Sequence, residues 1–198
     1  MIPRHYLVLT AVLFSIALAM AVYVWQLRRR EVLNAPQAPS SEHVSPPATG
    51  PVEQAKLWVV SDQEAALHTE SISIPLMSNR QQRGEELLRA LINRYREKNS
   101  PHPLSAGAEL HDVYLLDPGL AVVDLNTACV DSQTSGVLAE ELMLASIVET
   151  LAANVPGIVQ VKILVDGQQR ETLAGHADLS LAYEVTQVSE LAKQLTAQ

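Results

Sequence analysis

The sequence contains a single cysteine, Cys129, in 198 residues. One thiol excludes an intramolecular disulfide framework and any metal site that needs several cysteines. Glycine is also scarce, and because the eight glycines do not cluster, the chain has no glycine-rich phosphate-binding loop. The Gly-x-Ser-x-Gly elbow of the common hydrolases is missing as well. The sequence therefore lacks several of the usual catalytic motifs.

Aromatic residues and positive charge are sparse in most of the chain. Phe14 is the only phenylalanine, and from residue 56 onward only four aromatic residues occur: Trp58, Tyr95, Tyr114 and Tyr183. A core in this part must rest mainly on Leu, Val, Ile and Ala. All 22 acidic residues follow Arg30, together with only 10 of the 14 Lys and Arg, which gives this part a net charge of −12. An acidic body argues against general nucleic-acid binding, which needs positive charge to displace phosphate counterions.

Residues 6–27 form a run of 22 uncharged, mostly apolar residues. As a helix with a rise of about 1.5 Å per residue, the run would be roughly 33 Å long, enough to cross the hydrocarbon core of a bilayer. Tyr6 lies at one end and Tyr23 and Trp25 at the other, where aromatic rings favour the headgroup region. Three arginines, 28–30, end the run. The pattern predicts an N-terminal transmembrane helix that anchors the chain through residues 1–30.

Two alternatives to an uncleaved anchor are a buried core helix and a cleaved signal peptide. For a signal peptide, Arg4 would supply the basic region and 19–21 (AMA) the small-x-small cleavage pattern. The apolar run continues past that site to Trp25, which favours the anchor. The orientation of the anchor in the membrane stays open. By one charge, the positive-inside rule favours a cytoplasmic location for the residues after the anchor, but long domains translocate largely regardless of charge.

Residues 31–55 are predicted to be a proline-rich, disordered linker. Five of the 11 prolines lie here, at positions 36, 39, 46, 47 and 51. Proline removes backbone donors and fixes φ, so neither a helix nor a sheet can run through such a stretch. At about 3.1 Å per residue, an extended linker of about 25 residues would reach on the order of 75 Å and would hold a domain away from the bilayer.

Residues 56–188 are expected to form one domain. A strand over 56–60, a polar turn and a second strand over 66–75 predict a hairpin. A helix follows from Ser78, where Gln81 has the capping-box spacing, and Pro101 lies beyond its end. The apolar stripe of this helix consists of Leu87, Leu88, Leu91, Ile92 and Tyr95.

The second half of this domain repeats the order of two strands and a helix. Strands over 109–116 and 120–125 flank a turn at 117–119, and a helix over 133–154 follows. Strand 158–165 then leads into Asp166-Gly167, a hairpin signal that should return the chain as 170–173. Residues 189–198 are predicted to be a polar helical tail. The buried face of the second helix is expected to hold Leu138, Leu142, Ala145, Ile147, Val148 and Leu151.

The predicted order of elements is β-β-α-β-β-α-β-β. Strands and helices mixed in this way predict an α+β fold, with an antiparallel-rich mixed sheet and two helices packed on one face.

Four short segments of the second half follow the pattern of one family. Residues 120–126 (LAVVDLN) are similar to its "a-x-VDLS" strand, and 147–151 (IVETL) to its "IVNTL" helix end. Residues 159–167 (VQVKILVDG) are similar to a "V-x-x-V-x-ΦΦVDG" strand and turn, where Φ is apolar, and 175–180 (GHADLS) to "GH-x-DLS". In this order and at these spacings, residues 56–185 resemble the GerMN domain of sporulation and spore germination. Residues 127–129 depart from the pattern, which has a larger apolar or aromatic residue there.

The resemblance implies a place in the bacterial cell envelope, outside the cytoplasmic membrane, on a lipoprotein or an anchored chain. It also implies a non-enzymatic role in binding or assembly, with envelope proteins or peptidoglycan as partners. No cofactor is implied.

The six histidines do not suggest a metal site. They lie at positions 5, 43, 68, 102, 111 and 176, without the short helical spacing that zinc ligands need. His111 is expected at a strand start and His176 in a loop, where local hydrogen bonding or exposure explains them better than a metal.

The remaining reactive groups also lack catalytic partners. No base is suggested near Cys129, so a partly buried structural thiol is expected there. The pairs Glu85-Glu86 and Glu140-Glu141 each point about 100° apart on a helix, so neither pair forms a carboxylate dyad unaided.

Three aspartates stand out in the family pattern, and the residues themselves suggest structural roles for them. Asp166 would make a turn with Gly167, and Asp178 would form a side-chain-to-backbone turn with Ser180. Asp124 would face solvent or accept a hydrogen bond from a loop amide.

The sequence as a whole predicts a single-span membrane protein with an extracytoplasmic GerMN-type domain that binds or assembles envelope components. No catalytic, cofactor-binding or metal-binding residue is assigned. The alternatives are a peptidoglycan hydrolase, or an activator of one, with an unrecognised site, and a body that faces the cytoplasm.

Overall fold

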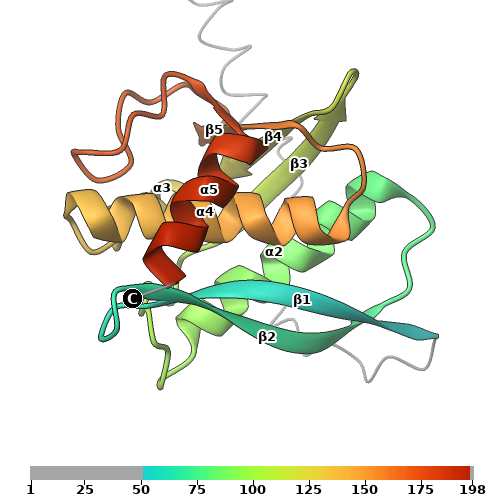
Figure 1. The fold of residues 1–198 in the computed structure, drawn as a ribbon, viewed down its shortest axis with the longest axis horizontal. Coiled ribbons are helices and arrows are strands. Elements are labelled where there is room, and N and C mark those ends of the chain that lie inside the picture. Colours follow the sequence, from blue (N-terminus) through green and yellow to red (C-terminus); the bar gives the residue numbers. More distant parts are fainter. Residues whose placement is uncertain (1–50, 197–198) are drawn as a thin grey trace, which may run out of the picture. The chain divides into compact units, whose positions relative to one another are not determined.

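The computed structural model describes residues 51–196, and side chains up to residue 194 (Figure 1). The expected transmembrane helix over 6–27 and most of the expected linker over 31–55 lie outside the described residues. Within residues 51–196, no helix combines the length and the apolar character needed to cross a membrane.

An N-terminal hairpin opens the domain. β1 (Val52–Ser61) pairs antiparallel with β2 (Ala66–Pro75) in an unbroken register, from Val52 opposite Pro75 to Ser61 opposite Ala66. The expected hairpin is therefore present, but β1 begins at Val52 rather than at residue 56 and so occupies the last residues of the expected linker. Pro51 lies just before β1, where its missing N–H costs no ladder hydrogen bond.

Helix α2 (Arg80–Arg96) follows, and its predicted stripe is buried. The expected N-cap, Ser78, is wrong by one residue. Asn79 has extended backbone angles, and its side chain accepts a hydrogen bond from the N–H of Gln82 at 2.8 Å. Asparagine caps a helix at least as well as serine, and the Ser78 hydroxyl instead bonds the Gln82 side chain at 3.3 Å.

The second sheet has four strands in the order β3-β4-β5-β6. They are β3 (Leu110–Leu116), β4 (Leu120–Leu125), β5 (Gln160–Val165) and β6 (Ala182–Glu184). β4 and β5 are parallel, while the two outer pairs are antiparallel. A parallel pair requires a long crossover, which α3 (Thr127–Asp131) and α4 (Val137–Asn154) supply.

The predicted return strand over 170–173 does not form. β6 pairs with β5 instead, and the intervening loop makes only isolated bridges, Val165 with Gln168 and Thr172 with Asp178. The Asp-Gly signal does make a tight turn, with φ of 50° at Asp166 and 72° at Gly167. A turn signal reports local geometry only, and the chain beyond this turn packs elsewhere.

The prediction of one sheet with two helices on a single face is also wrong. The hairpin and the four-stranded sheet are separate, and Figure 1 shows α2 and α4 lying between them. A Cβ added to Gly84 of α2 would lie 3.5 Å from side-chain atoms of both Leu151 on α4 and Val113 on β3. A small residue therefore lets the two helices and the larger sheet approach at this point. The helices bury apolar side chains from two sheets, which explains why α4 is buried nearly all round.

Helix α4 covers the free edge of β1 with a row of polar side chains. Asn154 bonds the N–H and the C=O of Lys56, at 3.0 and 2.7 Å. The Thr150 hydroxyl accepts from the N–H of Trp58 at 3.0 Å, and the Ser146 hydroxyl donates to the C=O of Trp58 at 2.5 Å. Four residues of helix rise about 6.0 Å, close to the about 6.7 Å between alternate residues of a strand. The row therefore replaces a third strand.

Replacing Thr150 by valine tests this row of hydrogen bonds. Valine has the shape of threonine but leaves the N–H of Trp58 without its acceptor, so the free energy of unfolding should fall by about 1–3 kcal/mol. Urea denaturation measures the change. Thr186→Val, at an exposed position of α5 (Val185–Thr196), is the control and should change stability by less than about 0.5 kcal/mol. Equal effects of the two substitutions would contradict the role of Thr150.

The end of the chain also differs from the expected tail. α5 begins at Val185, and Val188 and Ala192 are buried, so this helix packs onto the domain. Leu138, expected in the core, is 40% exposed because it lies in the first turn of α4. The other five predicted core positions of α4 are buried.

Candidate functional site

Asp124 and Asp166 meet at the carboxyl ends of the parallel strands β4 and β5. The Asp124 side chain is buried, and its Oδ1 accepts a hydrogen bond from the N–H of Gly167 at 2.8 Å. This is the loop amide predicted as one of two options. The Asp166 carboxylate accepts from the N–H and the hydroxyl of Thr127, at 3.3 and 2.5 Å. Asp124 thus connects the end of β4 to the turn after β5, and Asp166 connects the turn after β5 to the start of α3, which follows β4.

His111 lies beside both carboxylates. Its Nδ1 is 3.6 Å from Asp124 Oδ2 and 3.8 Å from Asp166 Oδ1. Hydrogen bonds from Thr127 lower the pKa of Asp166, so this carboxylate is ionised near neutral pH. Within residues 51–196, no group of three or more His, Cys, Asp or Glu side chains is arranged to hold a metal ion.

Asp178 has the turn role that the sequence predicts. Its Oδ1 accepts a hydrogen bond from the N–H of Ser180 at 2.7 Å, and interactions with Ser180 lower its pKa. The neighbouring Tyr183 hydroxyl donates to the backbone carbonyl of Asp178 at 2.5 Å. The side chain therefore shapes the chain just before β6.

Glu140, on the first turn of α4, is the polar residue that sequence reasoning missed. Its carboxylate is fully buried and accepts hydrogen bonds from the N–H groups of Ala174, His176 and Ala177 at 2.9–3.0 Å. Nδ1 of His176 lies 2.9 Å from Oε1. Glu140 thus holds the loop between β5 and β6 against α4. One partner is local, since the N–H of Gly136 lies 3.3 Å from Oε1, but the partners from Ala174 to Ala177 are more than 30 residues away and no local sequence signal indicates them.

His102 forms the arrangement that looks most like part of a catalytic triad. The ring is fully buried, with Nδ1 2.6 Å from Asp62 Oδ1. A hydrolase places a serine or cysteine at the second ring nitrogen. Here Nε2 faces the side-chain nitrogen of Gln133 at 2.8 Å, and the ring packs edge-on against Tyr95. The pair therefore lacks a nucleophile.

Cys129 is buried in α3, as the sequence predicts for a structural thiol. Burial raises the pKa of the thiol to about 12, with Arg96 only partly opposing the shift. The reactive thiolate is therefore almost unpopulated at neutral pH.

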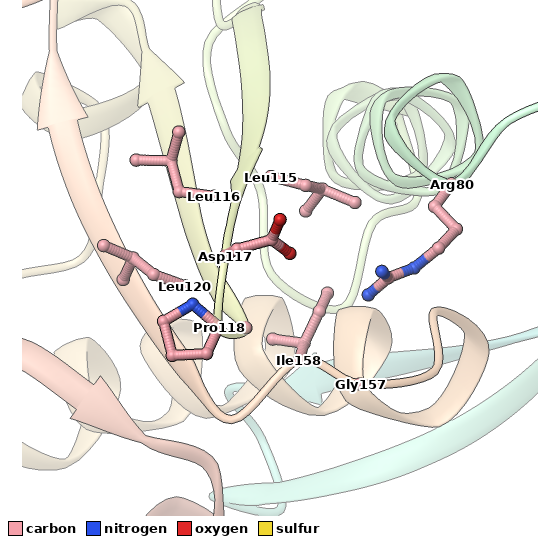
Figure 2. A pocket seen from close by; sticks show the side chains of 9 residues that line it. Arg80, Leu115, Leu116, Asp117, Pro118, Leu120, Gly157 and Ile158 are labelled. Carbon is pink, nitrogen blue, oxygen red and sulfur yellow. The ribbon is translucent and has the colours of Figure 1, made fainter.

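A shallow pocket lies where the β3–β4 turn meets the start of α2 and the turn after α4 (Figure 2). The side chains of Arg80 and Asp117 point into it, and Nη2 of Arg80 donates to the carbonyl of Pro156 at 2.5 Å. All the other lining residues are apolar or glycine: Leu115, Leu116, Pro118, Gly119, Leu120, Gly157 and Ile158. The pocket thus combines one cationic and one acidic side chain with an otherwise apolar lining.

Gly167→Val should destabilise the domain by about 1 kcal/mol or more. Gly167 has φ of +72°, where a branched side chain is strained, although an added Cβ would find only an ordinary contact with Asp124. Asparagine tolerates this region, so Gly167→Asn should cost less. Thermal melting of the three proteins measures the order. An unchanged melting temperature for Gly167→Val would contradict the positive-φ turn.

The chain matches the model of one protein family over residues 56–171, described as "Germane: Sporulation and spore germination". The comparison with curated proteins gave no match.

Three solved structures are similar. A chain described as "Putative Lipoprotein" from Clostridium perfringens is 23% identical, with a TM-score of 0.47, over 67% of this chain and 87% of that one. The tandem GerMN domains of the sporulation protein GerM from Bacillus subtilis are 16% identical, with a TM-score of 0.50, over 68% of this chain. The first GerMN domain of GerM alone is 16% identical, with a TM-score of 0.44, over 65% of this chain and 94% of that one. This chain covers 46% of the tandem GerM chain, and that likeness shows a shared fold.

Proposed function

Since the chain belongs to the Germane family of sporulation and spore germination, we propose that it is a non-catalytic binding or assembly module of the bacterial cell envelope. Its partners are envelope proteins, and peptidoglycan is a further ligand. The domain acts by contact and position rather than by turning over a substrate.

The use of the buried acids carries this proposal. Two of the three buried carboxylates within residues 51–196, Asp124 and Glu140, accept hydrogen bonds from backbone N–H groups of loops, and the third, Glu149, accepts one from the hydroxyl of Ser189. A general acid or base must instead exchange protons with a substrate. Asp124 and Glu140 thus hold loops in place, a structural role that a non-catalytic domain would also need.

Exposed apolar side chains on the larger sheet also support a binding role. Tyr114 and Leu116 of β3 lie on the same face, because alternate residues of a strand share a face, and they are 44% and 51% exposed. Apolar side chains gathered on an exposed face are typical of protein-binding surfaces.

We place the domain outside the cytoplasmic membrane, held by the anchor over residues 6–27 and spaced from the bilayer by the proline-rich linker. The charge of the body agrees with this spacing, since anionic headgroups would repel it. Protease treatment of intact spheroplasts tests the orientation. The body should be digested in unbroken cells, and a body that survives until lysis would reverse the orientation.

Incubation of the full chain with purified peptidoglycan and divalent metal ions tests the absence of catalysis. We expect no release of soluble fragments above a heat-denatured control. A second arm adds a known cell-wall amidase, whose rate should not change. Reproducible turnover in the first arm would establish a hydrolase instead, and stimulation in the second would establish an activator.

A further inference from the structure

The outer edge of β2 pairs with no other strand within residues 51–196. Trp58 of β1 lies opposite Thr69 of β2, and the N–H of Trp58 points away from β2 to reach Thr150. In an antiparallel pair, two directly opposed residues either exchange hydrogen bonds between their backbone N–H and C=O groups or both direct these groups away from the partner strand. The backbone N–H and C=O of Thr69 therefore point out from the hairpin. The same alternation directs the backbone groups of Ser71 and Ser73 outward.

No hydrogen bond within residues 51–196 occupies these outward backbone groups of Thr69, Ser71 and Ser73, and all three side chains are exposed. The contrast with β1 is sharp, because α4 covers the free edge of that strand. Figure 1 shows β1 between α4 and β2, with β2 at the border of the domain.

Protected edge strands usually carry a bulge, an internal proline or lysines. β2 has an unbroken register over ten residues, no Lys or Arg, and a proline only at its last position. Its one acidic side chain, Glu70, is already paired with Arg94 through two contacts of 3.0 and 3.1 Å. The edge is thus long, regular and nearly neutral, which favours pairing with another neutral strand.

We propose that β2 pairs with β2 of a second copy of this chain, antiparallel, about a two-fold axis at Ser71. Only residues with outward backbone groups can bond across such an interface. Ser71 then opposes Ser71 of the second copy, and Thr69 opposes Ser73. The hairpins of the two copies join into one four-stranded sheet with an isologous interface.

Two registers with the same alternation lie next to this one, and each has a disadvantage. Two-fold pairing about Glu70 would place two glutamates directly opposite each other, which destabilises a sheet. Two-fold pairing about Ile72 would overlap only residues 69–75 of the two strands, whereas pairing about Ser71 overlaps residues 67–75. Pairing about Ser71 places Glu70 opposite Ile72. It also lines up hydroxyls across the interface, since Thr69 and Ser73 face each other on either side of the Ser71 pair. Such Thr–Ser pairs are favourable across strands.

Cysteine cross-linking of the full chain in detergent micelles tests the register. In Ser71→Cys the two Cα atoms of a bonded pair would be about 5.5 Å apart, within the range of a disulfide. In Ser73→Cys, a control at another exposed position of the same edge, the two cysteines would be four residues out of register, about 13 Å apart along the strands. The native Cys129 is buried and should stay reduced. We expect a disulfide dimer for Ser71→Cys alone.

Sedimentation of the full chain supplies a second measurement. Ser71→Pro removes an N–H that β1 does not use, so the hairpin should persist while the dimer weakens at least 10-fold. The inference goes beyond the proposed function and stands whichever envelope partner the domain binds. A monomer at all concentrations would overturn it. Equal cross-linking of Ser71→Cys and Ser73→Cys, or faster cross-linking of Glu70→Cys, would overturn the proposed register.

Discussion

Replacing Glu140 by alanine is expected to lower the free energy of unfolding by about 3–5 kcal/mol. The carboxylate is fully buried, and its removal leaves the N–H groups of Ala174, His176 and Ala177 without an acceptor. Each buried donor left unpaired costs about 1–3 kcal/mol, less where water can enter. The loop between β5 and β6 should then open before the rest of the domain, which amide hydrogen exchange would detect.

The same residue makes stability depend on acid pH. Burial alone would raise the pKa of Glu140, but hydrogen bonds from Ala177, His176 and Ala174 outweigh it and lower the pKa from 4.5 to about 2. A depressed pKa means that the folded state holds the ionised form more strongly than the unfolded state does. The contribution of Glu140 is therefore complete above about pH 5 and is lost as the pH falls towards 2.

Glu140→Gln separates the charge from the shape of the side chain. It should destabilise the domain at neutral pH, and its loss of stability between about pH 5 and pH 2 should be smaller than that of the wild type. Asp166 and Asp178 also have lowered pKa values, so some acid sensitivity remains in the variant. Glu141→Ala is the matched control and should have little effect. Parallel pH–stability curves for wild type and Glu140→Gln would contradict the role of the carboxylate.

Gly119→Val is expected to cost about 3 kcal/mol or more. Gly119 has φ of +127°, where a branched side chain is strained, and a Cβ there would lie 2.5 Å from the carbonyl oxygen of Gly157. Backbone cannot move aside as a flexible side chain can. The turn between β3 and β4 would therefore separate from the turn before β5, where Gly119 O accepts from Val159 N at 2.8 Å.

Gly136→Val provides the control for backbone strain without the clash. Gly136 has φ of +152°, and an added Cβ would have no neighbour within 4 Å. Urea denaturation should show the larger loss of stability for Gly119→Val. NMR spectra of the folded Gly119→Val variant should also show changed side-chain signals in the pocket that contains Arg80. Equal losses at the two glycines would mean that the close approach of Gly119 to Gly157 has no energetic weight.

The predictable parts of the fold are those that depend on neighbours in sequence. The stripe from Leu87 to Tyr95 is buried because a helix of period 3.6 brings these residues to one side. The Asp166-Gly167 turn forms because Gly167 accepts positive φ. The burial of Cys129 and the turn role of Asp178 also follow from local chemistry.

The parts that sequence reasoning missed depend on residues far apart in the chain. Ser146, Thr150 and Asn154 look like polar interruptions of an apolar helix, yet they form the row that closes the edge of β1. Glu140 looks like one of two exposed acids until the chain beyond β5 folds back over it. In both cases the polar side chain is buried because its partner is a backbone group supplied from a distance.

By itself, the sequence determined an acidic α+β domain with one structural thiol, two amphipathic or buried helices, and most strands and turns close to their observed positions, the strand predicted over 170–173 being the exception. These features follow from periodicity, turn chemistry and charge, which act over a few residues. Only the tertiary structure decided that the strands divide into two sheets on either side of α2 and α4, and that α4 covers the edge of β1 whereas no strand within residues 51–196 pairs with the edge of β2. Strand pairing is decided by which distant backbone groups find partners, and no short stretch of sequence contains that information.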